Sequence, residues 1–431
     1  MRNATQALTV LAAIDPPRRA LLDERLAAIA ADLEHNAVLR PGDLPHTHFT
    51  RFLIIEDREL PALLAWEANH DGDPRAYLDE VVREVPAIDA LFECCTGYPD
   101  PDGGARSVDT RAGWLRARAV RAAAFYTAYR GISHRQVVND REVHDAIRTA
   151  LDRPGARAVL TGLHPSEIQR RLCEEVRATH PDLDVSPGVS QEPRWLIGKV
   201  AAIAALLVLL PALLVIVGPW YLVLRSHERT DVPYPNTRPV HDERGLSALE
   251  DRVTQNQLTH LVDIKPGWFR LATLAALLAA IGVIARVYAV RGDLGGITSI
   301  HFARWVIIRD RRPASALAPG TPRRHRLLFF SNYDGSWESY LGEFVDRAAY
   351  ALTAVWSNTV GFPRTEHLLG AGARDEEAFK QWTRRHQLVT QVWWSGVPDS
   401  TVQNIRDDIA IRRNLDRGLA DADAVTWLRT L

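Results

Sequence analysis

The sequence predicts an α+β fold in which two halves repeat the same order of strands and helices. Three observations support this prediction. Strand and helix patterns follow the order β-α-β-β-α-β over residues 1–153, the same order returns over 258–417, and a stretch without Asp, Glu, Lys or Arg separates them at 200–224. A chain of 431 residues with 46% hydrophobic content is long enough to bury two cores.

The elements of the first half follow from apolar spacing and turn residues. Alternating or continuous apolar runs predict strands, and apolar positions three and four apart predict helices. In chain order we expect a strand at 8–16, a helix at 21–33, a hairpin of 48–57 and 61–68, a helix at 75–85, a strand at 122–130 and a further helix at 136–151. Up to the last strand, this is the order of a ferredoxin-like unit, a four-stranded antiparallel sheet with two helices on one face.

The second half matches the first at related positions. LTHLVDIKP at 258–266 matches LTVLAAIDP at 8–16 in five of nine positions, and HFARWVIIRD at 301–310 matches HFTRFLIIED at 48–57 in six of ten. A third pair of segments, which begin with Asn-x-Asp-Gly, matches in seven of fourteen positions. Because order and spacing are both kept, we interpret the chain as an internal duplication. Two such units commonly bury their sheets on each other, so we expect a pseudo-two-fold α+β barrel.

The patterns also set the expected boundaries. We expect a first ferredoxin-like repeat at 1–153, a helical linker at 154–194, a membrane segment at 195–225, a polar loop at 226–257, a second repeat at 258–417 and a C-terminal tail at 418–431. The apolar part of the membrane segment, 200–224, would form a helix of about 37 Å, against a hydrocarbon thickness of about 30 Å. It either crosses the bilayer once or bends at Pro211 and leaves both halves on one side.

A second apolar stretch, 268–288, would also pass a hydropathy scan. It lies between the strands expected at 258–266 and 301–310, and these strands could not pair if the stretch crossed a bilayer. We therefore expect an unusually apolar packing helix, with one face on its sheet and the other on lipid or on 200–224.

The composition indicates which classes of partner and which cellular location to expect. Lys+Arg 52 against Asp+Glu 53 leaves a net charge of −1, which offers no basic field for nucleic acid. Cys94, Cys95 and Cys173 match neither a disulfide framework nor a zinc site, and the N-terminus lacks a signal-peptide pattern. Abundant arginine and alanine, with few lysines, are typical of a GC-rich bacterial genome. We expect a protein of the bacterial inner membrane, with its soluble parts in the cytoplasm and membrane lipid as a partner.

The candidate site residues are those that both halves retain. They form five pairs: His48 with His301, Arg51 with Arg304, Asn69 with Asn332, Asp71 with Asp334, and Tyr77 with Tyr340. Strand alternation gives Arg51 the same face as several apolar residues, and a buried arginine needs an acceptor. An anionic ligand between the sheets is one such acceptor. The favoured one is the aspartate of the same half, Asp71 for Arg51 and Asp334 for Arg304.

The other candidates have a structural and a functional interpretation as well. The histidines are more simply strand-end hydrogen-bonding residues than ligands, and Asn-x-Asp-Gly is typical of turns and helix caps. His46 and His48 point the same way on a strand, but Ser299 replaces the first histidine in the second half, so no metal site is expected.

Three segments of the second half carry a resemblance. QNQLTHLVDIKPGWFR, HFARWVIIRD and SNYDGSWESYLGEFVDRA resemble a bacterial family of membrane-attached proteins with repeated ferredoxin-like halves, which implies no activity. As a fold, the duplication is also similar to the dye-decolourising peroxidases, which bind haem in an α+β barrel and use a Gly-x-x-Asp-Gly motif. Here Ala68 and Ser331 stand where that motif has its first glycine.

The sequence contains no complete nucleotide-binding, serine-hydrolase or zinc-protease motif. We therefore expect a membrane-attached module that binds a small molecule between its sheets or a protein partner. The alternative is a haem-dependent, peroxidase-like oxidoreductase, in which Asp71 or Asp334 and a nearby arginine assist peroxide cleavage.

Overall fold

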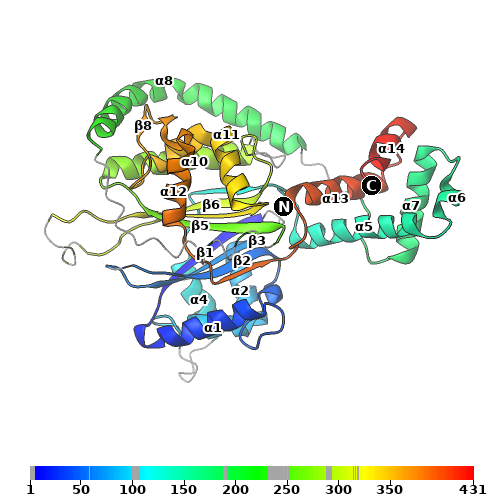
Figure 1. Ribbon diagram of the computed structural model, residues 1–431, viewed down its shortest axis with the longest axis horizontal. Helices are drawn as coiled ribbons and strands as arrows, with labels where there is room; N and C mark the ends of the chain where they lie inside the picture. The colour runs from blue at the N-terminus through cyan, green and yellow to red at the C-terminus, as the bar shows by residue number, and fades with distance from the viewer. Residues whose placement is uncertain are drawn as a thin grey trace.

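Two antiparallel four-stranded sheets lie face to face, with helices on both outer faces (Figure 1). The chain is thus an α+β protein, as its sequence predicts. The computed structural model describes residues 5–57, 59–99, 107–187, 192–231, 246, 250, 253–287, 294–313, 315, 317 and 320–431.

The strands are β1 (Thr5–Ala13), β2 (Thr47–Ile55), β3 (Leu63–Asp71), β4 (Ala124–Thr127), β5 (Gln255–Asp263), β6 (Ile300–Ile308), β7 (Arg326–Asp334), β8 (Thr365–Glu366), β9 (Gly370–Ala371) and β10 (Val392–Ser395). The helices are α1 (Arg19–Ala31), α2 (Pro74–Glu84), α3 (Asp89–Phe92), α4 (Val108–Arg118), α5 (His134–Asp152), α6 (Ala156–Leu160), α7 (Pro165–Thr179), α8 (Glu192–Thr230), α10 (Trp268–Val287), α11 (Trp337–Trp356), α12 (Glu376–His386), α13 (Val402–Leu415) and α14 (Asp421–Leu428). Each element predicted for the first half is present. Helices α4 and α12 are not among the predicted elements.

The Asn-x-Asp-Gly segments end β3 and β7 and turn the chain into the next helix. Gly72 and Gly335 have φ angles of 87° and 79°, which residues with a side chain rarely adopt. Asp73 then accepts two backbone hydrogen bonds at the start of α2, and Ser336 accepts one at the start of α11. The turn chemistry is as expected, but the cap of the following helix comes after the motif and not from its aspartate.

Each sheet contains one strand from the other half. The first sheet has the order β1-β3-β2-β10 and the second has β4-β6-β7-β5. Strand β10 pairs with β2, and β4 pairs with β6. The prediction that 122–130 completes the sheet of the first half is therefore wrong. The strand instead covers an edge of the second sheet that would otherwise keep its backbone groups unpaired.

The exchanged strands join the two sheets at both edges. The segment that leads to β4 first contacts β1, where Val120 N donates to Thr9 O at 2.8 Å, and then pairs with β6. In the same way Leu388 N donates to Thr259 O at 2.8 Å before β10 pairs with β2. Neither half forms its complete sheet without the other.

Buried apolar side chains fill three layers. Helices α1, α2 and α4 cover the outer face of the first sheet, and α10, α11 and α12 cover that of the second (Figure 1). Between the sheets lie apolar side chains from both halves, among them Leu53, Ile55, Leu261, Val306 and Leu328. Successive side chains of a strand point to opposite faces, and this alternation supplies both an outer and an inner layer.

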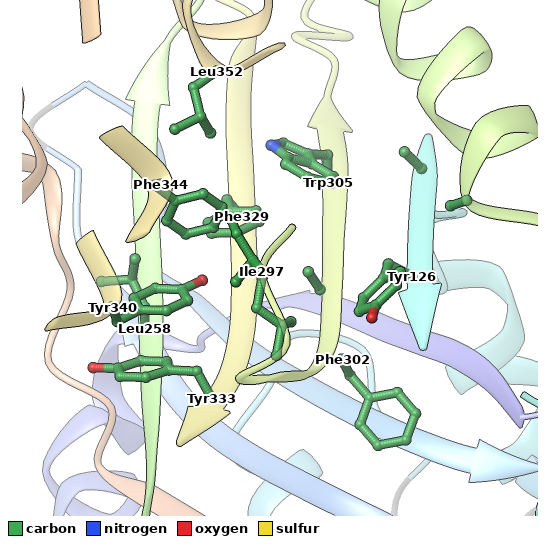
Figure 2. Close-up of a cluster of buried hydrophobic side chains, with 14 of the residues drawn as sticks. Tyr126, Leu258, Ile297, Phe302, Trp305, Phe329, Tyr333, Tyr340, Phe344 and Leu352 are labelled. Carbon is green, nitrogen blue, oxygen red and sulfur yellow. The ribbon is translucent and has the colours of Figure 1, made fainter. Parts of the chain in front are cut away.

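Aromatic rings dominate the packing between the second sheet and its helices (Figure 2). The rings of Trp305 on β6 and Phe329 on β7 have centroids 4.7 Å apart. Tyr333 of β7 stacks on Tyr340 of α11 at 3.8 Å. Such rings bury large apolar areas, so they hold α11 firmly on the sheet.

Helices α5 and α13 lie side by side beyond one end of the sheets, with α7 and α14 packed on them (Figure 1). Two crossed side-chain contacts join α5 to α13. Arg412 Nε donates to Asp140 Oδ1 at 2.8 Å, and His144 Nδ1 lies 2.7 Å from Asp408 Oδ1. Asp140 and Asp408 occupy the same place relative to the starts of their helices, so the relation between the halves continues into this extension.

Helices α8 and α10 are the most apolar helices of the described chain. Helix α8 arches over the outer helices of the second half (Figure 1), and its two parts, Leu196–Ala212 and Val215–Thr230, are bent by 72°. Helix α10 is long and apolar enough to be a candidate membrane span. It nevertheless connects β5 and β6, which both pair with β7, and it buries Leu274 and Leu278 in the core of the second half. This position agrees with the packing role expected for 268–288.

Cysteine labelling on either side of α10 tests this arrangement. Pro266→Cys and Thr298→Cys place a thiol at exposed positions before and after the helix, and the three native cysteines are buried. Because β5 and β6 share a sheet, both new thiols should react with a membrane-impermeant maleimide from the same side of sealed vesicles. Reaction of the two thiols from opposite sides would contradict the packing role.

Candidate functional site

The two candidate arginines meet in the layer between the sheets. Arg51 of β2 and Arg304 of β6 are 0% and 1% exposed. Strand alternation sets their direction, because Arg51 shares a face with Leu53 and Ile55, which also lie between the sheets. Strands β2 and β6 therefore bring two cations into one buried layer.

Arg51 makes most of its hydrogen bonds to the opposite sheet. Its Nη1 atom donates to Leu258 O at 3.1 Å and to Thr259 Oγ1 at 3.0 Å. Its Nη2 atom donates to Ser331 O at 3.1 Å and to Asn332 Oδ1 at 2.5 Å. The guanidinium of a β2 residue thus bridges β5 and β7 of the second sheet.

Arg304 makes the reciprocal contacts to the first sheet. Its Nη1 atom donates to Leu8 O and, at 3.2 Å, to Thr9 Oγ1. Its Nη2 atom donates to Ala68 O at 2.9 Å and to Asn69 Oδ1 at 2.5 Å. These four acceptors stand at the positions related to those that the other arginine uses, so each half holds the arginine of the other.

One carboxylate, Glu67 of β3, lies between both arginines. Its Oε2 atom accepts from Arg51 Nε at 2.7 Å, and its Oε1 atom lies 2.6 Å from Arg304 Nη2. The prediction that Arg51 pairs with Asp71 and Arg304 with Asp334 is wrong. Strand alternation places Glu67 on the inner face with the arginines, whereas the aspartates lie at the strand ends and bind histidines.

The second half has no equivalent of Glu67. The related residue of β7 is Phe330, whose ring centroid lies 5.2 Å from the guanidinium carbon of Arg51. Two buried cations therefore share one buried carboxylate, and carbonyl and amide oxygens compensate the remaining positive charge. Burial lowers the pKa of Arg304 to about 10, against the opposing effect of Glu67, so the side chain stays protonated at neutral pH.

The candidate histidines and aspartates form two equivalent pairs. His48 Nε2 lies 2.9 Å from Asp71 Oδ1, and His301 Nε2 lies 2.8 Å from Asp334 Oδ1. The second oxygen of each aspartate accepts the N–H of the first residue of α5 or α13 at 2.7 Å. Burial opposes ionisation of Asp71, but the hydrogen bonds from His48 and from the start of α5 lower its pKa below the ordinary value. Each aspartate thus fixes a lateral helix to a sheet.

The asparagines and tyrosines complete the same structural network. Asn69 and Asn332 accept the arginine hydrogen bonds described above. The Tyr77 hydroxyl lies 2.8 Å from Thr47 Oγ1, and the Tyr340 hydroxyl donates to a β7 serine at 2.6 Å. All ten candidates therefore have partners within the protein.

Access from solvent to this network is small. Eight of the ten candidates are at most 2% exposed, and the side chains of Asp71 and Asp334 are 9% and 13% exposed. Within the described ranges, no three His, Cys, Asp or Glu side chains are grouped as metal ligands. The network can hold the sheets together, but a substrate in solvent does not reach it.

Open space lies on the outer faces instead. One groove of about 700 Å³ lies between α2 and α4, and another of about 680 Å³ lies between α11 and α12. A cavity of about 20 Å³ in the second half is lined by His260, Trp356 and Trp382 and has room for about one water molecule. Neither outer groove is predicted from the sequence, because α4 and α12 are not among the predicted elements.

Glu67 is the important residue that sequence reasoning missed. A signal existed, because Glu67 is a charged residue inside a strand that is otherwise mostly apolar. It also lies two residues before Asn69, which puts both on one face.

Comparison of the chain with protein-family models, with curated proteins and with solved structures finds no match. The function must therefore be argued from geometry.

Replacing the shared carboxylate tests its role. Glu67→Gln keeps the size of the side chain but leaves two buried cations without a counterion, so we expect a loss of about 3–5 kcal/mol in unfolding free energy. Urea denaturation of the detergent-solubilised protein measures it. Glu24→Gln on the exposed surface of α1 is the control and should change stability by less than about 0.5 kcal/mol. A similar small effect for both variants would contradict the shared-counterion role.

Two buried histidines should make the protein acid-sensitive. Burial lowers the pKa values of His70 and His134 to about 4, while a histidine in an unfolded chain titrates near pH 6.5. The unfolded state therefore binds protons first, and stability should fall as the pH decreases from about 6.5 to about 4.

His70→Tyr tests this effect with the residue that the second half uses. His70 stacks on Tyr77 at 3.9 Å, and Tyr333 takes the related place against Tyr340. The variant should lose less stability than the native protein between pH 7 and about pH 4.5, as measured by urea midpoints. The exposed-histidine variant His35→Gln should retain the native pH dependence. An unchanged pH dependence in His70→Tyr would refute the assignment.

Proposed function

We propose that the chain is a membrane-attached protein-interaction module, built as a pseudo-two-fold α+β barrel from two ferredoxin-like repeats. The observation that carries the membrane attachment is the exposed apolar surface of α8. The related elements and reciprocal arginine contacts support the repeat, and the exchanged strands that join both sheet edges support the barrel. We also propose the bacterial inner membrane as its location, with the soluble parts in the cytoplasm, in agreement with the resemblance to a membrane-attached bacterial family.

Large apolar side chains are exposed along α8 from Leu196 to Val217. Their exposed fractions run from 43% to 79% for Leu196, Ile197, Val200, Ile203, Leu206, Leu207, Val208, Leu209, Leu210, Val215, Ile216 and Val217. Soluble proteins rarely leave so large a continuous apolar surface in water. A bilayer would remove it from water, and residues 200–224 carry no Asp, Glu, Lys or Arg that would oppose insertion.

The C-terminal end of α8 is attached to the second half. Leu224 is 0% exposed and packs in a small cluster with Leu368. Trp220 Nε1 donates to Thr273 Oγ1 of α10 at 3.0 Å, and Glu228 accepts the N–H of Leu368 at 2.7 Å. These contacts fix one end of the apolar helix to the folded body.

The 72° bend of α8 supports a segment that enters the bilayer and returns. It lies directly after Pro211, where one of the two interpretations of the sequence expects a bend. The exchanged strands require both halves to be on one side of the membrane. A returning segment satisfies both conditions.

The inner layer gives no support to a ligand site between the sheets. A small molecule or haem placed there would separate the sheets and break the hydrogen bonds of Arg51 and Arg304. Asp71 and Asp334, the residues proposed to assist peroxide cleavage, each hold a histidine and the start of a helix. These residues do not fit a haem site, so the proposal keeps the interaction module and not the peroxidase-like alternative.

Membrane attachment through α8 is testable with charged variants. Leu207→Arg combined with Val208→Arg places two charges in the apolar stretch, at positions 64% and 79% exposed. The native protein should float with liposomes of phosphatidylethanolamine and phosphatidylglycerol in a density gradient, and the variant should lose most of this flotation. Val159→Arg on α6, a position 60% exposed, is the matched control and should float normally. Unchanged flotation of the double variant would refute attachment through α8.

A further inference from the structure

The two outer grooves occupy related places in the two halves. One lies between α2 and α4, and the other between α11 and α12. Arg116, near the end of α4, corresponds to Arg384 of α12, because each lies three residues before the backbone bridge to the first strand of its half. The two grooves can therefore be compared with each other. The group that binds in one groove indicates which kind of group the other can bind.

In the second half, a segment of the chain itself supplies a carboxylate to this place. Glu250, which precedes β5, lies 2.7 Å and 2.8 Å through its two oxygens from Arg384 Nη1. Gln387 Nε2 donates to Glu250 at 2.6 Å, and Trp337 Nε1 donates to Gln387 Oε1 at 3.0 Å. The Arg384 guanidinium also stacks on the Trp337 ring at 3.7 Å. Glu250 is only 9% exposed, so its carboxylate is buried against Arg384.

In the first half, the related place is lined by small residues and is open. Pro74 stands in place of the tryptophan and Ala119 in place of the glutamine, and both line the groove of about 700 Å³. Its wall and floor also include the apolar side chains of Leu8 and Leu78.

The charged rim of the open groove favours an acidic ligand. It contains Arg75, Arg116 and Asp79, which sum to one positive charge. Arg116 Nη1 binds Asp79 at 2.5 Å, but the two side chains are 32% and 34% exposed, so this pair leaves the groove open to solvent. An incoming carboxylate can bind the other N–H groups of Arg116 and those of Arg75.

We propose that the groove between α2 and α4 is a docking site for an acidic peptide segment of a partner protein. The segment inserts an apolar side chain over Leu8 and Leu78 and places a carboxylate against Arg116, as Glu250 does against Arg384 in the second half. This inference rests on the proposed interaction function and names the site and the class of partner. It does not depend on membrane attachment, which liposome flotation measures separately.

A peptide with the chain's own sequence is a suitable probe. The fluorescein-labelled decapeptide GLSALEDRVT, the sequence of residues 245–254, contains the leucines and the glutamate of the segment before β5. Fluorescence anisotropy with the full-length protein in nanodiscs should show saturable binding. Arg116→Ala should weaken the binding at least tenfold, and Ala119→Trp, which fills the groove, should abolish it. A peptide with glutamine in place of its glutamate should also bind at least tenfold more weakly.

Controls separate this site from the alternatives. Arg83→Ala, at an exposed position on the same helix α2, should bind the peptide normally, and circular dichroism should give the same spectrum for all variants. Absence of saturable binding, or equal binding by Arg116→Ala, would overturn the proposal. Loss of binding only in Arg384→Ala would place the peptide in the second groove and would also overturn it. A native dimer that dissociates in Arg116→Ala would identify a second copy of the chain, not an acidic partner, as the occupant.

Discussion

The reciprocal contacts of Arg51 and Arg304 are the constraint on which the rest of the structure depends. Each arginine belongs to one sheet, and its guanidinium donates hydrogen bonds to carbonyl and amide oxygens of the other sheet. A buried cation without acceptors costs several kcal/mol, so both arginines are compensated only while the sheets are together. The polar groups predicted as a possible ligand site therefore make their hydrogen bonds within the protein, where they hold the two halves together.

The exchange of β4 and β10 couples the halves a second time. Each sheet edge that would be open in an isolated half is covered by a strand of the other. The His–Asp pairs extend this coupling to α5 and α13, because each aspartate binds both a strand histidine and a helix start. The two halves can differ at related positions, such as Glu67 in the first and Phe330 in the second, without loss of the fold because the other contacts remain.

The sequence predicts the elements well and their partners poorly, and particular residues explain the difference. Apolar spacing is a local property, so it predicts β2, β3 and α2 within a few residues. Asp71, the partner predicted for Arg51, is retained in both halves, whereas the actual partner Glu67 is present in only one. Strand β4 has only four residues, and so short an apolar run does not indicate which sheet edge the strand will join. Long-range pairing is decided by the edges left open elsewhere in the chain.

The exchanged strands also restrict how the apolar segments meet a membrane. A single crossing by α8 would put β4 and β6 on opposite sides, yet these strands are hydrogen-bonded. A crossing by α8 followed by a return through α10 would isolate β5 from β7, yet the two pair over their whole length. Both pairings are preserved if a segment that enters the bilayer also leaves it on the same side. Helix α8 has the bend that such a path needs, and its end is fixed to α10 by Trp220. The strand pairing of the two halves thus restricts the path that α8 can take in a membrane.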